Sequence, residues 1–183
     1  LTPHFGAVFC HERAHIHVDE CGAPEFFSQG AKLVPVKGAP GKLTPENIKG
    51  AHARFQKRDV HHVQPATISI SQATELGTSY ATAEVQAIAN LAQAEGMALH
   101  MDGARLANAL AHLKCKPSDV TWKAGVDVLS FGVTKNGALA AEAVIFFDPK
   151  RTADLAYRRK RGGHLLSKMR FVSAQIEAML DDG

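Results

Sequence analysis

TAEVQAIANLAQAEGMALHMDGARLANALAHL, residues 82–113, is the stretch that decides the fold we expect for this chain. Its first half predicts a helix, because apolar side chains recur at helical spacing from Val85 to Ala92. We expect Thr82 to cap the amino end of this helix and Gly96 to end it. Residues 97–101 are a short apolar run, so the stretch predicts a helix followed directly by a strand.

The same alternation of helices and strands continues in both directions along the chain. Thr44, Pro45 and Glu46 are typical of a helix start, and a further helix is expected over 106–113. The last residues, 150–183, look mostly helical with a break at Gly162-Gly163. Further strands are expected at Lys32–Val36, Val63–Ile70, Val126–Phe131 and Ala143–Phe147. This order favours an α/β fold with a mainly parallel sheet flanked by helices.

Composition narrows the class of protein. The chain has 183 residues, 45% of them hydrophobic, which suits one domain with a sizeable core. A net charge of +3 without a concentrated basic face gives no reason to expect a nucleic-acid partner, and no apolar run is long enough to cross a membrane. Three cysteines favour a reducing, cytoplasmic setting. Because Leu1 is not Met, we expect a fragment of a longer protein or a processed piece.

Two charged residues follow predicted strands, where the ligands of parallel sheets gather. Asp102, with Arg105 three residues later, could hold a charged ligand; alternatively, Asp102 caps the next helix and Arg105 lies in solvent. Lys135 follows the strand over 126–131, and a desolvated lysine can form a Schiff base. Thr134 beside it could contact a phosphate. The alternative for Lys135 is a solvated turn lysine.

Histidines and cysteines concentrate near the amino end. His11, His15 and His17 are flanked by Cys10 and Cys21, and imidazole and thiolate are the ligands that zinc prefers. Their spacing fits no standard zinc pattern, so we predict no metal site. An imidazole could instead stack on an aromatic cofactor, and an ordinary core or surface histidine is the remaining alternative.

Two other groups are weaker candidates. Either residue of the pair His61-His62 could be a general base near neutral pH, but adjacent side chains on an extended segment point in opposite directions. The basic residues of 150–170, which include Lys160 and Arg170, could bind a phosphate or a carboxylate or lie at a subunit contact. For most of them, a solvated helix face is the simpler interpretation.

Three motifs together resemble one family. AHIHVDECG (14–22), HMDGARLANA (100–109) and TKNG (134–137) occur in the order found in the low-specificity L-threonine aldolases. These are pyridoxal-phosphate enzymes with the aspartate-aminotransferase-like fold. The resemblance covers nearly the whole chain and implies the large domain of a fold-type-I enzyme. Residues 1–150 would be the central part of that cofactor-binding domain, and 151–183 a helical segment leading toward a small domain.

The resemblance also implies a role for each motif residue. Lys135 would form a Schiff base with pyridoxal 5′-phosphate, and Asp102 would pair with the protonated pyridine nitrogen. Arg105 would bind the substrate carboxylate as a bidentate guanidinium. His15 would stack on the cofactor ring, and Thr134 would contact its phosphate.

Other assignments rest on position alone. Counting back from Gln72-Ala73-Thr74 without gaps selects His62 as the histidine near the substrate hydroxyl, with His61 as the alternative. Glu20 matches a family position near the stacking histidine. Lys160 and Arg170 would serve the cofactor phosphate or a neighbouring subunit.

The reaction that the resemblance implies is retro-aldol cleavage of L-threonine or L-allo-threonine to glycine and acetaldehyde. Its catalytic residues would be Lys135, His15 and His62, in a homodimer or homotetramer that acts on a small β-hydroxy amino acid. One alternative is another pyridoxal-phosphate enzyme, either a β-eliminating lyase or an aminotransferase. The other is a non-catalytic metal-binding module built on the histidines and cysteines.

Overall fold

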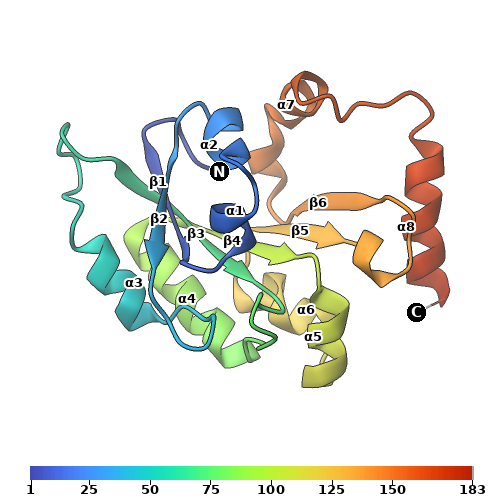
Figure 1. Cartoon of the computed structure of the whole chain (residues 1–183), viewed down its shortest axis with the longest axis horizontal. Helices are drawn as coiled ribbons and strands as arrows, with labels where there is room; N and C mark the ends of the chain where they lie inside the picture. Colours follow the sequence, from blue (N-terminus) through green and yellow to red (C-terminus); the bar gives the residue numbers. More distant parts are fainter. Residues whose placement is uncertain (183) are drawn as a thin grey trace.

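One mainly parallel sheet organises the protein. In the computed structural model, which describes residues 1–182, six strands form a sheet in the order β2-β1-β3-β4-β5-β6 (Figure 1). All neighbouring strands are parallel except β5 and β6, which are antiparallel. The strands are β1 (Gly6–His11), β2 (Lys32–Val36), β3 (Gln64–Ser71), β4 (Ala98–Gly103), β5 (Val128–Gly132) and β6 (Glu142–Phe146). The predicted α/β fold with a mainly parallel sheet is confirmed.

The helices connect the strands and continue past the sheet. In chain order they are α1 (His15–Val18), α2 (Ala23–Phe27), α3 (Pro45–His52), α4 (Thr82–Glu95), α5 (Leu106–Leu113), α6 (Pro117–Val120), α7 (Leu155–Arg161) and α8 (Arg170–Asp182). Short 3-10 turns are η1 (Trp122–Ala124), η2 (Thr134–Asn136) and η3 (Pro149–Thr152). The helix expected over 106–113 and the strand over 32–36 match α5 and β2 at both ends. The two helices of the C-terminal stretch leave the expected break between them.

Local chemistry explains where the helices begin and end. Thr44 caps α3 as expected, because its hydroxyl accepts a hydrogen bond from the Asn47 amide. Gly96 ends α4 in the left-handed conformation, with φ of 70°. The prediction that Thr82 caps α4 is wrong. The cap is Ala81, whose amide donates to the Glu84 carboxylate at 2.7 Å, so the charge of Glu84 replaces the hydroxyl expected at the cap.

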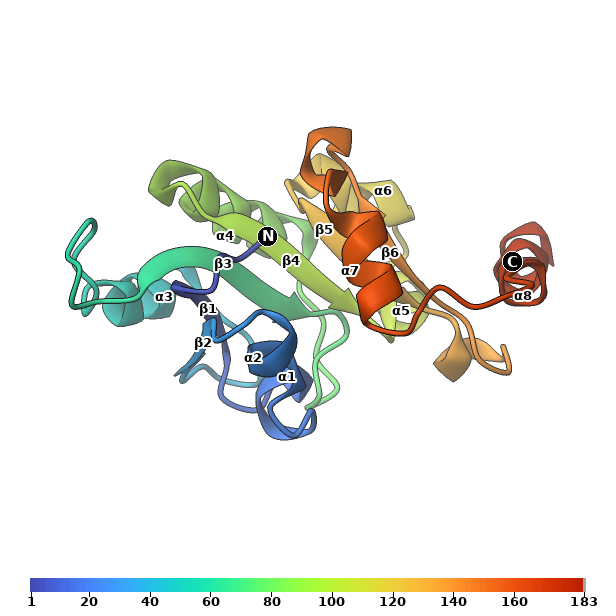
Figure 2. The same cartoon turned by 90° about the horizontal axis from the view of Figure 1, so that it is seen from above.

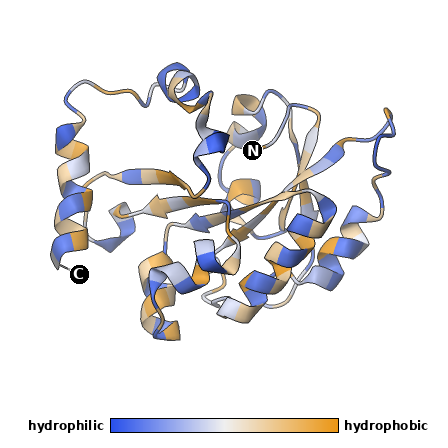
Figure 3. Ribbon diagram, turned by 180° about the vertical axis from the view of Figure 1, so that it is seen from behind, coloured by the Kyte–Doolittle hydropathy of each residue, from blue (hydrophilic) through white to orange (hydrophobic). Residues whose placement is uncertain are grey.

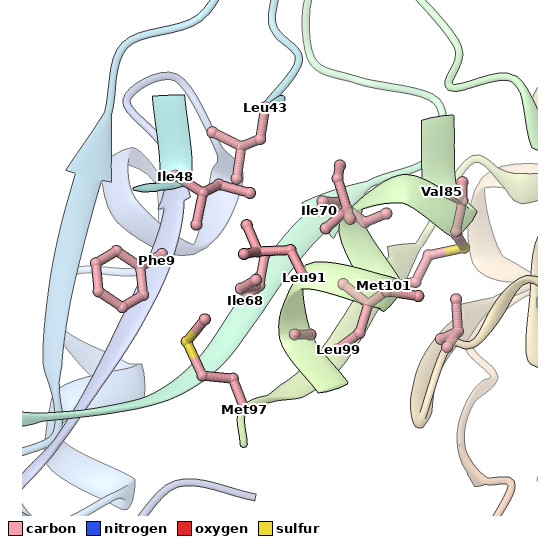
Figure 4. Packing of buried hydrophobic residues seen from close by; sticks show 14 of the residues in the cluster. Phe9, Leu43, Ile48, Ile68, Ile70, Val85, Leu91, Met97, Leu99 and Met101 are labelled. Carbon is pink, nitrogen blue, oxygen red and sulfur yellow. The ribbon is translucent and has the colours of Figure 1, made fainter. Parts of the chain in front are cut away.

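The hydrophobic core fills one face of the sheet. Ile68, Ile70, Leu99 and Met101 alternate along β3 and β4 and pack against the apolar side of α4, where Val85 is fully buried (Figure 4). Each such side chain stabilises the fold by about 1.5–3 kcal/mol. Hydrophobic residues follow the strands through the middle of the molecule, whereas the outer helices carry mixed character (Figure 3). This packing holds the ends of the strands in fixed register.

The opposite face of the sheet is polar in its centre. Thr67 and Ser69 on β3 and His100 and Asp102 on β4 alternate with the core residues and point away from the core. Helices α1 and α2 lie on this side, across the sheet from α4 (Figure 2). The amino-terminal segment also lies on this face, because the hydroxyls of Thr2 and Thr67 are 2.7 Å apart. The face therefore offers polar groups close to the strand ends.

Candidate active site

Asp102 lies at the carboxyl end of β4, between two serine-bearing strands. Its register partners are Ser71 on β3 and Ser130 on β5. Its side chain is half-buried, and Oδ1 accepts a hydrogen bond from the Ala104 amide at 3.0 Å. It is not the cap of α5, which begins at Leu106 with Arg105 in the cap position. One carboxylate oxygen thus orients the side chain, while the other makes no hydrogen bond within the described residues.

Lys135 lies in η2, directly after the neighbouring strand β5. Its side chain is exposed. The strand end beneath it is very close to the loop after Asp102, since a Cβ added to Gly132 would lie 2.9 Å from Ala104 Cα. Adjacent parallel strands thus bring Asp102, near the end of β4, and Lys135, just after β5, to one edge of the sheet.

Thr134 is engaged in the turn itself. Its hydroxyl accepts from the Ala141 amide at 3.2 Å and donates to the Ala141 carbonyl at 3.3 Å, which joins the two ends of the loop between β5 and β6. Asn136 adds a hydrogen bond from its side-chain amide to the Gly132 carbonyl at 3.1 Å. The described structure therefore gives the Thr134 hydroxyl a structural role, and contact with a phosphate stays a prediction.

His15 is brought to the same edge by a residue that the sequence analysis did not select. The Glu75 carboxylate accepts hydrogen bonds from the His15 amide at 3.0 Å and from the Ser71 hydroxyl at 2.7 Å. Because Ser71 is the register partner of Asp102, Glu75 ties the first residue of α1 to the strand end beside Asp102. The His15 Nδ1 lies 2.8 Å from the Glu20 carboxylate, so the two residues that the family resemblance pairs, His15 and Glu20, are in contact.

Arg105 lines a separate hollow of about 620 Å³ beside this edge. Its backbone carbonyl accepts from the Ala73 amide at 3.4 Å, which joins the loop after β3 to the loop after β4. Its half-buried side chain shares the hollow with hydroxyl, carboxylate, amide and imidazole groups. These come from Thr74, Glu75, Thr78, Ser79, Asn108 and His112. The guanidinium is the group in this hollow that suits a small carboxylate, while the Glu75 carboxylate is already engaged by the His15 amide and the Ser71 hydroxyl.

The structure does not bring His62 to this edge, so its role in the site stays a prediction. His62 precedes β3, whereas Asp102 pairs with Ser71 at the far end of that strand. Eight residues of strand separate the two ends by roughly 23 Å. The His62 ring is used locally, where Nδ1 accepts from the Gln56 amide at 3.2 Å. His61 is exposed in the same loop, so neither histidine reaches this edge in the described chain.

The remaining candidates lie apart from this edge. Lys160 and Arg170 are exposed on α7 and α8 (Figure 1), and Arg170 stacks on Phe171 with its guanidinium carbon 4.7 Å from the ring centre. Within residues 1–182, no three metal-binding side chains cluster as a metal site would require. His11, for example, is bonded to the Gly38 carbonyl at 2.7 Å. Nor does any helix of this part of the chain have the length and apolarity to span a bilayer.

The residues at this edge fit a pyridoxal cofactor. A carboxylate, Asp102, suits the protonated ring nitrogen, and a primary amine, Lys135, suits the aldehyde. An imidazole, His15, offers a flat face of ring size. Asp102 lies at the carboxyl end of β4, Lys135 follows β5 and His15 follows β1, so all three lie at the end of the sheet where ligands bind in open α/β folds.

Comparison with known proteins agrees with this geometry. The chain is 48% identical over 183 residues to a low-specificity L-threonine aldolase from a Pseudomonas species, covering all of this chain and 52% of that protein. It is 46% identical to the same enzyme from Pseudomonas aeruginosa, again covering 52% of it. Its structure superposes on a threonine aldolase from Leishmania major with a TM-score of 0.89 and 30% identity, over 97% of this chain and 51% of that one.

These findings confirm the family resemblance predicted from the three motifs. The chain spans about half the length of the curated relatives it matches. The family model for beta-eliminating lyases matches residues 2–182, which is nearly the whole chain. The protein therefore belongs to the beta-eliminating lyase family.

Proposed function

We propose that this protein acts in the pyridoxal-phosphate-dependent retro-aldol cleavage of L-threonine or L-allo-threonine to glycine and acetaldehyde. The observation that carries the proposal is the meeting of Asp102, Lys135 and His15 at one edge of the sheet. Similarity to low-specificity L-threonine aldolases over the whole chain supports it.

The cofactor, when bound, supplies an electron sink for the pair of electrons released when a bond to the amino-acid Cα breaks. The protein's own residues hold and orient the reactants. Lys135 is the covalent attachment point, and Asp102 accepts the hydrogen bond of the protonated ring nitrogen. Arg105 binds the substrate carboxylate, and its place in the 620 Å³ hollow supports this role.

His15 is the residue we propose as the base that accepts the proton of the substrate hydroxyl. A carboxylate can only accept hydrogen bonds, so Nδ1 is the donor in the short contact between His15 and Glu20. The proposed role uses the tautomer in which Nδ1 keeps this proton and Nε2 accepts one from the substrate hydroxyl. The sequence analysis gave ring stacking to His15 and the contact with the substrate hydroxyl to His62. Because His62 lies at the other end of β3, we assign both roles to His15.

The experiment is a reconstitution with pyridoxal 5′-phosphate. We expect visible absorbance from lysine-bound cofactor, and acetaldehyde and glycine in equal amounts from L-threonine. Lys135→Ala should abolish both, while Lys123→Ala, a lysine on η1, should change neither. Unchanged absorbance in Lys135→Ala would refute the lysine assignment.

A second candidate reaction is β-elimination, which the description of the matching family favours. The same assay decides between them, because elimination from L-serine yields pyruvate and ammonia rather than an aldehyde and glycine. Release of pyruvate without aldehyde would replace the aldol proposal.

Further parts of the proposal concern the protein as a whole. We propose a cytoplasmic homodimer or homotetramer acting on small β-hydroxy amino acids. Residues 1–150 would form the central part of the large domain, and 151–183 would lead toward a small domain. The separation of α8 from the sheet supports this division (Figure 2). Size-exclusion chromatography with light scattering tests the oligomer.

A further inference from the structure

A histidine on the polar face of the sheet bridges three strands next to the candidate site. The His100 ring, on β4, contacts the Ser69 hydroxyl of β3 through Nδ1 and the Ser130 hydroxyl of β5 through Nε2, each at 2.9 Å. One neutral imidazole offers one donor and one acceptor, and each hydroxyl can take the complementary role. The bridge is therefore fully hydrogen-bonded without any charge.

The bridge lies close to both Asp102 and the turn that carries Lys135. His100 and Asp102 are two residues apart on one strand, so their side chains lie on the same face of the sheet. Ser130 is the register partner of Asp102, and the strand that carries it leads through Gly132 to Lys135. The hydrogen bond to Ser130 thus joins β4 to β5 close to the carboxyl ends of both strands, where Asp102 and Lys135 lie.

The neutral state of the ring agrees with this placement. Burial lowers the pKa of His100, although the negative charge of Asp102 acts in the opposite direction. A neutral ring leaves Asp102 without a competing cation on its own strand. Its carboxylate is then free to pair with a cation brought by a ligand.

We propose that His100 is a positioning residue, which sets the relative placement of Asp102 and Lys135 through its hydrogen bond to Ser130. This inference rests on the cofactor-binding part of the proposed function. It differs from a merely structural role in one respect. If the bridge only stabilised the sheet, its two serines would be equivalent, whereas a positioning role makes Ser130 matter far more than Ser69.

The test compares single-hydroxyl deletions in the reconstituted protein. Ser130→Ala should raise the dissociation constant for pyridoxal 5′-phosphate about tenfold and shift the absorbance of bound cofactor, with the KM for L-threonine within twofold. Both variants should lower the Tm of the cofactor-free protein by about the same amount. Ser69→Ala, however, should raise the dissociation constant for pyridoxal 5′-phosphate less than threefold. Thr67→Val, on the same strand and face but outside the bridge, is the matched control.

Substitution of the histidine completes the test. His100→Phe should show the Ser130→Ala defect in cofactor affinity and absorbance, and His100→Gln, which can still donate and accept, should restore part of both. Equal effects of the two serine variants, or an unchanged cofactor affinity in His100→Phe, would overturn the inference. Cofactor binding without aldol cleavage in the unsubstituted protein would instead refute only the proposed reaction.

Discussion

Gly132→Ala is the substitution that most directly tests whether the close approach of two loops builds the site. The added Cβ would lie 2.9 Å from Ala104 Cα, whereas ordinary contacts of a Cβ lie at 3.4–4 Å. It would also lie 2.7 Å from Glu142 Oε2, but that side chain can swing into solvent. The backbone at Ala104 must therefore move by about 0.5–1 Å, which shifts the loop after Asp102 away from the turn that carries Lys135.

The magnitude follows from this shift. Overpacking of this kind costs about 1–3 kcal/mol of unfolding free energy, and 2 kcal/mol lowers the Tm of a protein of this size by about 4–8 °C. A misplacement of about 1 Å between reacting groups lowers kcat on the order of 10²-fold. Thermal unfolding and steady-state aldehyde release measure the two effects.

A matched glycine-to-alanine control is available on α3. A Cβ at Gly50 meets no atom within 4 Å, and alanine in a helix is favoured over glycine by about 1 kcal/mol. Gly50→Ala should raise the Tm slightly and leave kcat unchanged. If Gly132→Ala keeps full kcat while its Tm falls, the spacing of the two loops does not control the chemistry, and our reasoning fails.

Three further predictions concern single side chains. Asp102→Asn should lower kcat on the order of 10²-fold with little change in Tm, since one preorganised charge is lost; kinetics near wild type would contradict the role of Asp102. Burial raises the pKa of Cys10 to about 12, so iodoacetamide should label the exposed Cys21 in the native protein and spare Cys10, as peptide mass spectrometry can check. The lowered pKa of His100 means that the unfolded state binds more protons as the pH falls below about 6.5. Unfolding free energy should then fall with decreasing pH by up to about 1.4 kcal/mol per unit more than in His100→Gln, and equal slopes in urea titrations would exclude it.

The sequence predicted the fold well where the spacing of apolar residues and the residues that end an element indicate the same boundaries. The helix at 82–95 has both an apolar stripe and a terminal glycine, and its expected end at Gly96 is confirmed. The strand β1 was missed, although it lies between β2 and β3. Its sequence, GAVFCH, shows no alternation because both of its faces are buried, and its last residues resemble metal ligands more than sheet residues.

Site residues could be predicted where they directly follow a strand. They could not be predicted where their place in the site depends on contacts between distant parts of the chain. Asp102 and Lys135 follow apolar strands, and the rule for ligands of parallel sheets selects them. Glu75 lies in a loop after β3, and nothing in its sequence context announces that it binds the backbone of His15, 60 residues away. The same rule applied to β3 would have drawn attention to the residues after Ser71. His62 was selected by counting along the chain, which does not take account of the length of β3 between this histidine and the residues after Ser71.

The turn that carries Lys135 has a mechanical consequence. Asp102 is anchored in a strand with neighbours on both sides, whereas η2 contributes no buried residue and rests at the tip of a two-stranded hairpin. The role that we propose for Lys135 requires its amine to move during turnover, and a position at the exposed end of the hairpin would allow this while the strand that carries Asp102 stays fixed. Amide hydrogen exchange should accordingly be fast over 134–137 and slow over 99–102.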